Sequence, residues 1–214
     1  MICGYAHDDR SGAFASLFPL LEQETPEFTS ICILANREEV GNSAAIGIKS
    51  KAIDAFLQDL CKAQGVSVRR CIANSCCMAA DPTFAFDSTF DDAFDVRNDA
   101  HINGGVGVCK YPSKGGKMGG SEPTAEAIAW FCRLLDDGGV IWQSATQGAV
   151  DRGGGGTVTM EIENRNITSV DIGTPVISMH TPMELASKLD LYMTQKAMRV
   201  FYGAKESFFM EQYL

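Results

Sequence analysis

The chain has 214 residues, of which 45% are apolar and 21% are charged, and this composition is typical of a folded domain. Its 18 basic and 27 acidic residues give a net charge of −9, which excludes the basic surface that a nucleic-acid partner requires. No apolar run approaches the roughly 20 residues of a membrane span. The N-terminal sequence shows no secretory signal, so we expect a cytoplasmic protein with no membrane partner.

Eight cysteines are spread along the chain, and no two of them form a C-x-x-C pair. A zinc ribbon or a thioredoxin-type motif is therefore not indicated. The chain is long enough to build an apolar core without disulfide bonds, and most of the cysteines lie in apolar segments. We predict free thiols in a reducing compartment.

Segments with helical periodicity alternate with short apolar runs that are typical of buried strands. The predicted helices cover residues 11–22, 51–63 and 122–135, and a last helix begins at the capping box Thr181-Pro182-Met183-Glu184. The predicted strands cover residues 31–35, 76–80, 106–109, 140–142 and 170–172. This alternation predicts an α/β fold with helices on both faces of a mixed, mostly parallel sheet. Since no linker or repeat divides the chain, we expect one domain over residues 1–214.

Polar residues at the ends of these elements are candidates for a site, because ligands of open α/β sheets bind at the carboxyl ends of the strands. They are Asp8-Asp9-Arg10, Glu38-Glu39, Asp81 and His180. Each has an ordinary explanation alone, as a helix cap, a solvated turn or a satisfied histidine. Together, carboxylates and an imidazole can surround zinc, cobalt or manganese. In such a site one glutamate of the pair can bind metal while its neighbour handles the proton of the attacking water.

A glycine-rich segment, Gly153 to Thr157, precedes a predicted helix and could hold an anion or a substrate backbone. It has neither the Lys-Ser/Thr of a P-loop nor the spacing of a dinucleotide fingerprint, so a nicotinamide or flavin site is a weaker alternative.

Three segments resemble the aspartyl aminopeptidase family of dinuclear zinc metallopeptidases, particularly its bacterial members. They are Gly4-Tyr5-Ala6-His7-Asp8-Asp9-Arg10, Arg37-Glu38-Glu39-Val40-Gly41 and the stretch from Val170 to Thr181 that contains Ser178-Met179-His180. The resemblance implies a three-layer αβα sandwich, two zinc ions and peptide substrates. It also implies hydrolysis of the N-terminal peptide bond, with a preference for acidic N-terminal residues that rests only on the family and on Lys110.

The resemblance implies a role for each matching residue. Asp8 matches the carboxylate that bridges the two metals, Glu38 the general base, and Asp9 and Arg10 supporting neighbours. Glu39 and His180 match ligands of one metal, and Asp81 a ligand of the other. The residues that match substrate-binding positions are Lys110, Gly154, Gly155, Gly156 and Thr157.

The chain departs from the family pattern at its N-terminus. Family members carry a preceding segment with a further metal-binding histidine and an inserted dimerisation domain, and this chain begins after both. His7 and His101 match no ligand position, so the second metal keeps only Asp8 and Asp81. We therefore expect one complete and one incomplete zinc site. The alternative to an active aminopeptidase is a non-catalytic or split-half subunit, in which a partner chain supplies the segment; a homo-oligomer is also expected from the family.

Overall fold

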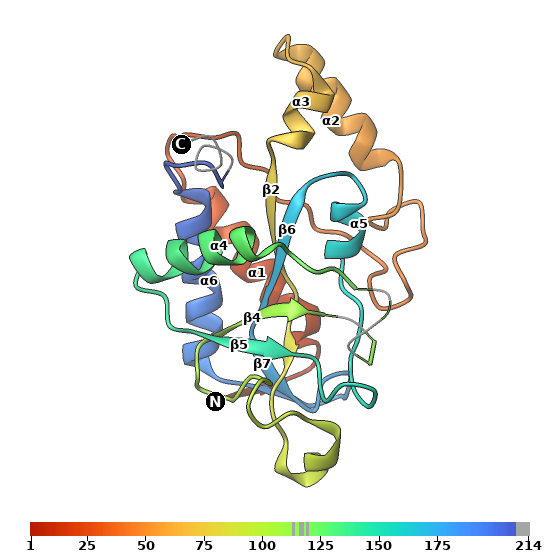
Figure 1. The fold of residues 1–214 in the computed structure, drawn as a ribbon, viewed down its shortest axis with the longest axis vertical. Coiled ribbons are helices and arrows are strands. Elements are labelled where there is room, and N and C mark those ends of the chain that lie inside the picture. Colours follow the sequence, from red (N-terminus) through yellow and green to blue (C-terminus); the bar gives the residue numbers. More distant parts are fainter. Residues whose placement is uncertain (113, 116–117, 119, 209–214) are drawn as a thin grey trace.

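The computed structural model describes residues 1–112, 114–115, 118 and 120–208, and the fold is a mixture of helices and two sheets (Figure 1). The helices are α1 (His7–Leu21), α2 (Ala52–Ala63), α3 (Val68–Ala73), a 3-10 helix η1 (Ser88–Ala93), α4 (Ala125–Asp137), α5 (Thr159–Glu163) and α6 (Lys188–Tyr202). The strands are β1 (Ile2–Gly4), β2 (Cys76–Ala80), β3 (Thr83–Phe84), β4 (Val106–Tyr111), β5 (Trp142–Thr146), β6 (Thr168–Gly173), β7 (Pro175–Ile177) and β8 (Glu184–Ala186).

The larger sheet has the strand order β2-β6-β4-β5. The β2–β6 and β4–β5 pairs are parallel, whereas β4 and β6 run antiparallel. The second sheet has the order β1-β8-β7-β3. The two sheets meet where their strands continue into each other, since only Asp81 and Pro82 separate β2 from β3, and only Thr174 separates β6 from β7. Residues just after β2 therefore lie at the junction of the sheets.

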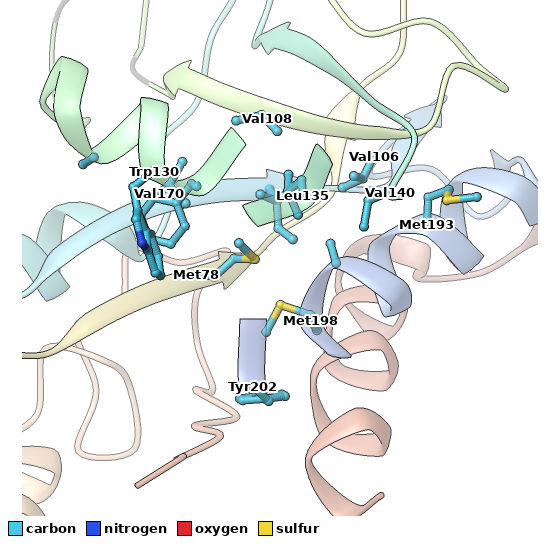
Figure 2. Close-up of a cluster of buried hydrophobic side chains, with 14 of the residues drawn as sticks. Met78, Val106, Val108, Trp130, Leu135, Val140, Val170, Met193, Met198 and Tyr202 are labelled. Carbon is cyan, nitrogen blue, oxygen red and sulfur yellow. The ribbon is translucent and has the colours of Figure 1, made fainter. Parts of the chain in front are cut away.

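The main core lies between the larger sheet and the helices α4 and α6. Figure 2 shows Met78 of β2 and Val170 of β6 facing Trp130 and Leu135 of α4. Met193, Met198 and Tyr202 of α6 belong to the same buried cluster, and α1 packs along α6. This packing buries apolar side chains that would each cost about 1.5–3 kcal/mol to expose, and it fixes the strand ends that carry the polar residues.

Most of the predicted elements are present, and the predicted α/β class is confirmed as a mixed α/β fold. The predicted strand 76–80 coincides with β2, and the helices predicted at 11–22, 51–63 and 122–135 correspond to α1, α2 and α4. The predicted strand 31–35 is wrong, because these residues have no regular secondary structure. Within the described part of the chain no strand pairs with them, and a strand exists only where a neighbour completes its ladder.

The predicted start of the last helix is also wrong. Glu184 lies in β8 and not in the first turn of a helix, and α6 begins four residues later. Its N-cap is Ser187, whose hydroxyl oxygen accepts a hydrogen bond from the N–H of Leu189. The side chain of Glu184 instead accepts hydrogen bonds from the backbone N–H groups of His180, four residues earlier, and of the distant Asp8, and these contacts outweigh the local capping box.

Two further observations concern membrane-spanning helices and the cysteines. Among the described residues, no helix is both long enough and apolar enough to cross a bilayer. The eight cysteines carry free thiols, and Cys61 and Cys109 are buried.

Candidate metal centre

Three side chains from distant parts of the chain converge next to the N-terminus of α1. The Nε2 atom of His180 lies 2.9 Å from Oδ2 of Asp8 and 3.1 Å from Oε2 of Glu39. One ligand atom from each of the three lies within 4.8 Å of the others. The side chain of Asp8 is 7% exposed, whereas those of His180 and Glu39 are 57% and 51% exposed. The cluster is therefore anchored inside the protein and open to solvent on one side.

A buried carboxylate fixes two members of this cluster. Glu184 is 2% exposed, and its Oε2 accepts a hydrogen bond from the backbone N–H of Asp8 at 3.0 Å. Its Oε1 accepts a second hydrogen bond from the backbone N–H of His180 at 2.8 Å. One side chain thus ties the first turn of α1 to the loop after β7. Sequence reasoning assigned Glu184 to a helix cap, and only its spacing four residues after His180 could have indicated this second use.

Three further carboxyl groups surround the cluster. Burial, followed by repulsion from Asp8, raises the pKa of Asp9 to about 8. Burial and the neighbouring Glu39 raise the pKa of Glu38, whereas the side chain of the buried Asn42 lowers it. Burial, and then repulsion from Asp9, raises the pKa of Asp81 well above its usual value. The predicted acids are therefore neighbours in space, although Asp81 is not among the three groups that share one point.

Burial and the crowding of carboxyl groups both disfavour the charged forms of these acids. Burial, followed by repulsion from Glu39, raises the pKa of Asp8 to about 7. Crowded carboxylates repel one another, and a divalent cation between them removes this cost. Two carboxylate oxygens and one imidazole nitrogen form a ligand set that suits Zn²⁺. The donor chemistry of Asp8, Glu39 and His180 therefore fits a zinc ion.

The predicted site residues Lys110 and Arg10 lie outside the cluster of three. Lys110 lines a cavity of about 510 Å³ together with Tyr111 and Gln147, and its Nζ lies 4.0 Å from Oε1 of Glu122. The guanidinium of Arg10 lies 5.7 Å from the ring centroid of Tyr5.

The glycine-rich segment leads into α5, as its sequence predicts. Gly154 has a φ of +111°, a conformation that favours glycine, and Gly155 and Gly156 follow it. Thr157 is buried, and its hydroxyl donates a hydrogen bond to Oδ2 of Asp171 at 2.8 Å. The side chain of Thr157 thus anchors the end of the segment, and its glycine backbone forms the outer part.

The remaining histidines do not join the cluster of three. His101 Nε2 lies 3.1 Å from the carbonyl oxygen of Val96, and its ring packs on Phe86. The Nε2 atom of His7 is buried and has no hydrogen-bond partner among the described residues.

The family model for the aminopeptidase I zinc metalloproteases (M18) matches residues 1–202 of the chain. The chain belongs to the M18 family. The predicted relationship is thereby confirmed at the level of the M18 peptidases, while a specificity for aspartyl residues stays a prediction. Zinc, as the metal named for the M18 family, agrees with the ligand set of Asp8, Glu39 and His180.

Named M18 relatives and solved M18 structures agree with this assignment. The probable M18 family aminopeptidase 1 of Borrelia garinii subsp. bavariensis is 34% identical over 209 residues, which are 94% of this chain and 46% of the relative. The crystal structure of aminopeptidase I from Clostridium acetobutylicum has a TM-score of 0.88 at 33% identity, over 94% of this chain and 44% of that one. The M18 aminopeptidase structure from Thermotoga maritima has a TM-score of 0.84 at 29% identity, over 94% and 45%. The chain thus spans about half the length of the relatives it matches.

Proposed function

We propose that the chain is the zinc-binding part of a metallo-aminopeptidase that hydrolyses the N-terminal peptide bond of peptides. The observation that carries this proposal is the convergence of Asp8, Glu39 and His180 within 4.8 Å in a chain of the M18 family. Zinc, when bound, polarises a carbonyl oxygen and lowers the pKa of water, which is the chemistry that peptide hydrolysis requires.

The residues around the zinc ligands supply the proton transfers. Glu38 is adjacent in sequence to the ligand Glu39, and its carboxyl group interacts with the side chain of Asn42. Its raised pKa brings it closer to neutral pH, which favours a group that must both accept and return a proton. We assign Glu38 as the general base that takes the proton of the attacking water and returns it to the leaving amine. Asp9 and Arg10 support the first turn of α1.

The substrate is an unblocked peptide in this proposal. Its free amine is a cation that suits the acidic surroundings of Asp8, Asp9 and Glu38. The backbone of Gly154 to Gly156, ending at Thr157, would lie along the peptide. Lys110, on the wall of the 510 Å³ cavity, would favour an acidic N-terminal side chain.

The second metal and the assembly belong to the same proposal. Asp8 and Asp81 would hold a second zinc, with cobalt or manganese as alternatives. Asp8 and Asp81 are two ligands only, and in the alternative reading a partner segment completes this second site. We further propose a cytoplasmic homo-oligomer, and a three-layer αβα sandwich for the complete family fold.

The test compares peptide hydrolysis and zinc content in matched variants of the zinc-loaded protein. Glu38→Gln should lower the release of the N-terminal residue by about 10²–10⁴-fold while zinc remains bound, because general-base catalysis is worth that factor. His180→Ala should lower the zinc content itself. Glu126→Gln, an exposed glutamate on α4, is the control and should change neither. Undiminished hydrolysis by Glu38→Gln would contradict the assigned base. No hydrolysis by the zinc-loaded parent chain would favour the subunit that needs a partner.

A further inference from the structure

The two glutamates of the metal centre lie in a loop that contains neither helix nor strand. No such element covers residues 22–51, between α1 and α2. Within this stretch residues 36–50, here called loop 36–50, fold back on themselves, because the N–H of Asn36 donates to the carbonyl oxygen of Ile46 at 3.2 Å. Among the described residues, no backbone–backbone hydrogen bond joins loop 36–50 to another part of the chain. The place of the loop relative to the other zinc ligands therefore depends on side chains.

One arginine ties this loop to two helices. Arg165 is the second residue after α5, and its side chain is only 13% exposed. Its Nη2 donates hydrogen bonds to the carbonyl oxygens of Ile48 at 2.7 Å and Ser50 at 3.2 Å. Its Nη1 donates to the carbonyl oxygen of Glu161 in α5 at 2.6 Å, and its Nε donates to Oδ1 of Asp54 in α2 at 2.8 Å. In Figure 1 the loop, drawn in orange, passes beside α5.

This set of contacts requires a guanidinium group. The planar fork of an arginine presents several N–H donors in fixed directions, whereas a lysine offers a single ammonium. The salt bridge from Lys49 of the loop to Glu161 of α5 is longer, at 3.6 Å, and the Lys49 side chain is 39% exposed. Exposed ion pairs of this kind contribute little. Arg165 is therefore the stronger link between the loop and α5.

The helix that carries these contacts is itself fixed to the larger sheet. The hydroxyl of Thr159, in the first turn of α5, donates to Oδ2 of Asp171 in β6 at 2.6 Å, and that of Thr157 donates to the same oxygen at 2.8 Å. Asp171 is 2% exposed, so this anchor is buried. β6 leads into β7, and His180 lies three residues after the end of β7. Arg165 thus joins the loop of Glu39 to the same sheet from which His180 extends.

We propose that Arg165 is a positioning residue of the metal centre, whose guanidinium fixes loop 36–50 against α5 and so sets the places of Glu39 and Glu38. Its hydrogen-bond partners are Asp54 and three backbone carbonyl groups, so it acts through the loop and not by contact with zinc. Without these bonds the loop has no fixed position, and Glu39 meets the other two ligands less often. The inference rests on the proposed function, since it takes Glu39 as a zinc ligand and Glu38 as the base.

The test compares zinc affinity and hydrogen exchange between the full chain and its Arg165→Lys variant. The lysine keeps the positive charge but cannot bond to both carbonyl groups of the loop. Zinc, titrated against a chromophoric chelator, should bind about 10–100-fold more weakly. The amides of Gly41 and Asn42, which donate to carbonyl groups within the loop, should exchange at least about tenfold faster. Arg199→Lys is the control and should change neither, because Arg199 forms an exposed ion pair with Glu22.

A double-mutant cycle separates positioning from a general loss of stability. If Arg165 acts through Glu39, Arg165→Lys should lower the zinc affinity by less than about twofold in a Glu39→Gln background, because the ligand that it places is already gone. Equal losses in both backgrounds would overturn the proposal, since a merely structural role gives additive effects. If Arg165→Lys does not fold, Asp54→Asn replaces it, because this change removes only the partner of Nε; it should weaken zinc binding in the same direction by a smaller factor, and an unchanged affinity overturns the proposal.

Failure of the proposed function gives a different result. Glu39→Gln alone should weaken zinc binding, and an unchanged affinity would contradict the proposed ligand set. An effect of Glu39→Gln together with no effect of Arg165→Lys would contradict the positioning role alone. Both readouts require no catalysis, so a chain that binds zinc without hydrolysing peptides still tests the inference.

Discussion

Glu184 offers a sharp test of how the metal centre is held, because it contacts no metal in our assignment and yet touches two of the residues that do. Its two oxygens accept the backbone N–H groups of Asp8 at 3.0 Å and His180 at 2.8 Å. Glu184→Gln keeps the shape of the side chain but replaces one acceptor oxygen by an NH₂ donor. One of the two partly buried N–H groups must then lose its partner.

The size of the effect follows from these two bonds. A hydrogen bond to a charged group contributes about 1.5–3 kcal/mol, and an orphaned buried N–H costs about 1–3 kcal/mol. We expect Glu184→Gln to lower the free energy of unfolding by about 2 kcal/mol. Because residues that orient metal ligands typically change affinity by 10–100-fold, zinc should bind about 10–100-fold more weakly.

The assay combines denaturant unfolding with zinc titration against a chromophoric chelator. Glu122→Gln is the control, since this glutamate is exposed and lies away from the cluster of three. Hydrogen exchange at the amides of Asp8 and His180 adds a local readout and should accelerate in Glu184→Gln alone. A folded Glu184→Gln protein with unchanged zinc affinity and unchanged exchange would refute the positioning role.

Three further predictions concern stability. Burial raises the pKa of Asp171 to about 7, so between pH 3.8 and about 7 the folded protein keeps a proton that the unfolded chain releases. The free energy of unfolding therefore falls as the pH rises through this range. Asp171→Asn should remove this dependence of the free energy of unfolding on pH, which amounts to up to about 4 kcal/mol over the range. Unfolding curves measured from pH 3.8 to about 7 that keep the same pH dependence would contradict the raised pKa of Asp171. Leu135 of α4 is fully buried in the main core, and Leu135→Ala should cost about 2–5 kcal/mol in denaturant unfolding, with less than 1 kcal/mol counting against that packing. Asp190 accepts hydrogen bonds from the N–H groups of Asn103 at 2.7 Å and Gly105 at 2.8 Å. Asp190→Asn should therefore lower the free energy of unfolding by about 1–3 kcal/mol, and with it the melting temperature. An unchanged melting temperature would exclude this anchoring role.

The elements that were predicted correctly are marked by features of a few consecutive residues, such as an apolar run, helical periodicity or a helix cap. The run Cys76–Ala80 forms β2, and the helical periodicity of residues 122–135 corresponds to α4. In α4, the hydroxyl oxygen of Thr124 accepts the N–H of Ala127, which is an N-cap that sequence can show. Periodicity and capping are properties of a few consecutive residues, and they are therefore readable without the fold.

The predictions that failed depend on residues far away in the chain. Residues 31–35 have the composition of a buried strand, but a strand also requires a neighbour, and the described residues provide none. Glu184 fits a capping box by spacing, whereas its partners include an N–H 176 positions away. The convergence of Asp8, Glu39 and His180 was expected from their positions at strand and helix ends, and the structure brings these three together. Asp81, which the resemblance assigns to the other metal, lies outside that group.

The measurement that tests the central claim most directly is zinc K-edge X-ray absorption of the zinc-loaded protein and of its His180→Ala variant. The parent protein should show oxygen ligands and one imidazole nitrogen at about 2.0–2.1 Å, and the imidazole signal should be lost in His180→Ala. Sulfur ligands at about 2.3 Å would instead assign the metal to some of the eight cysteines. An imidazole signal that persists in His180→Ala would equally contradict a zinc ion held by Asp8, Glu39 and His180.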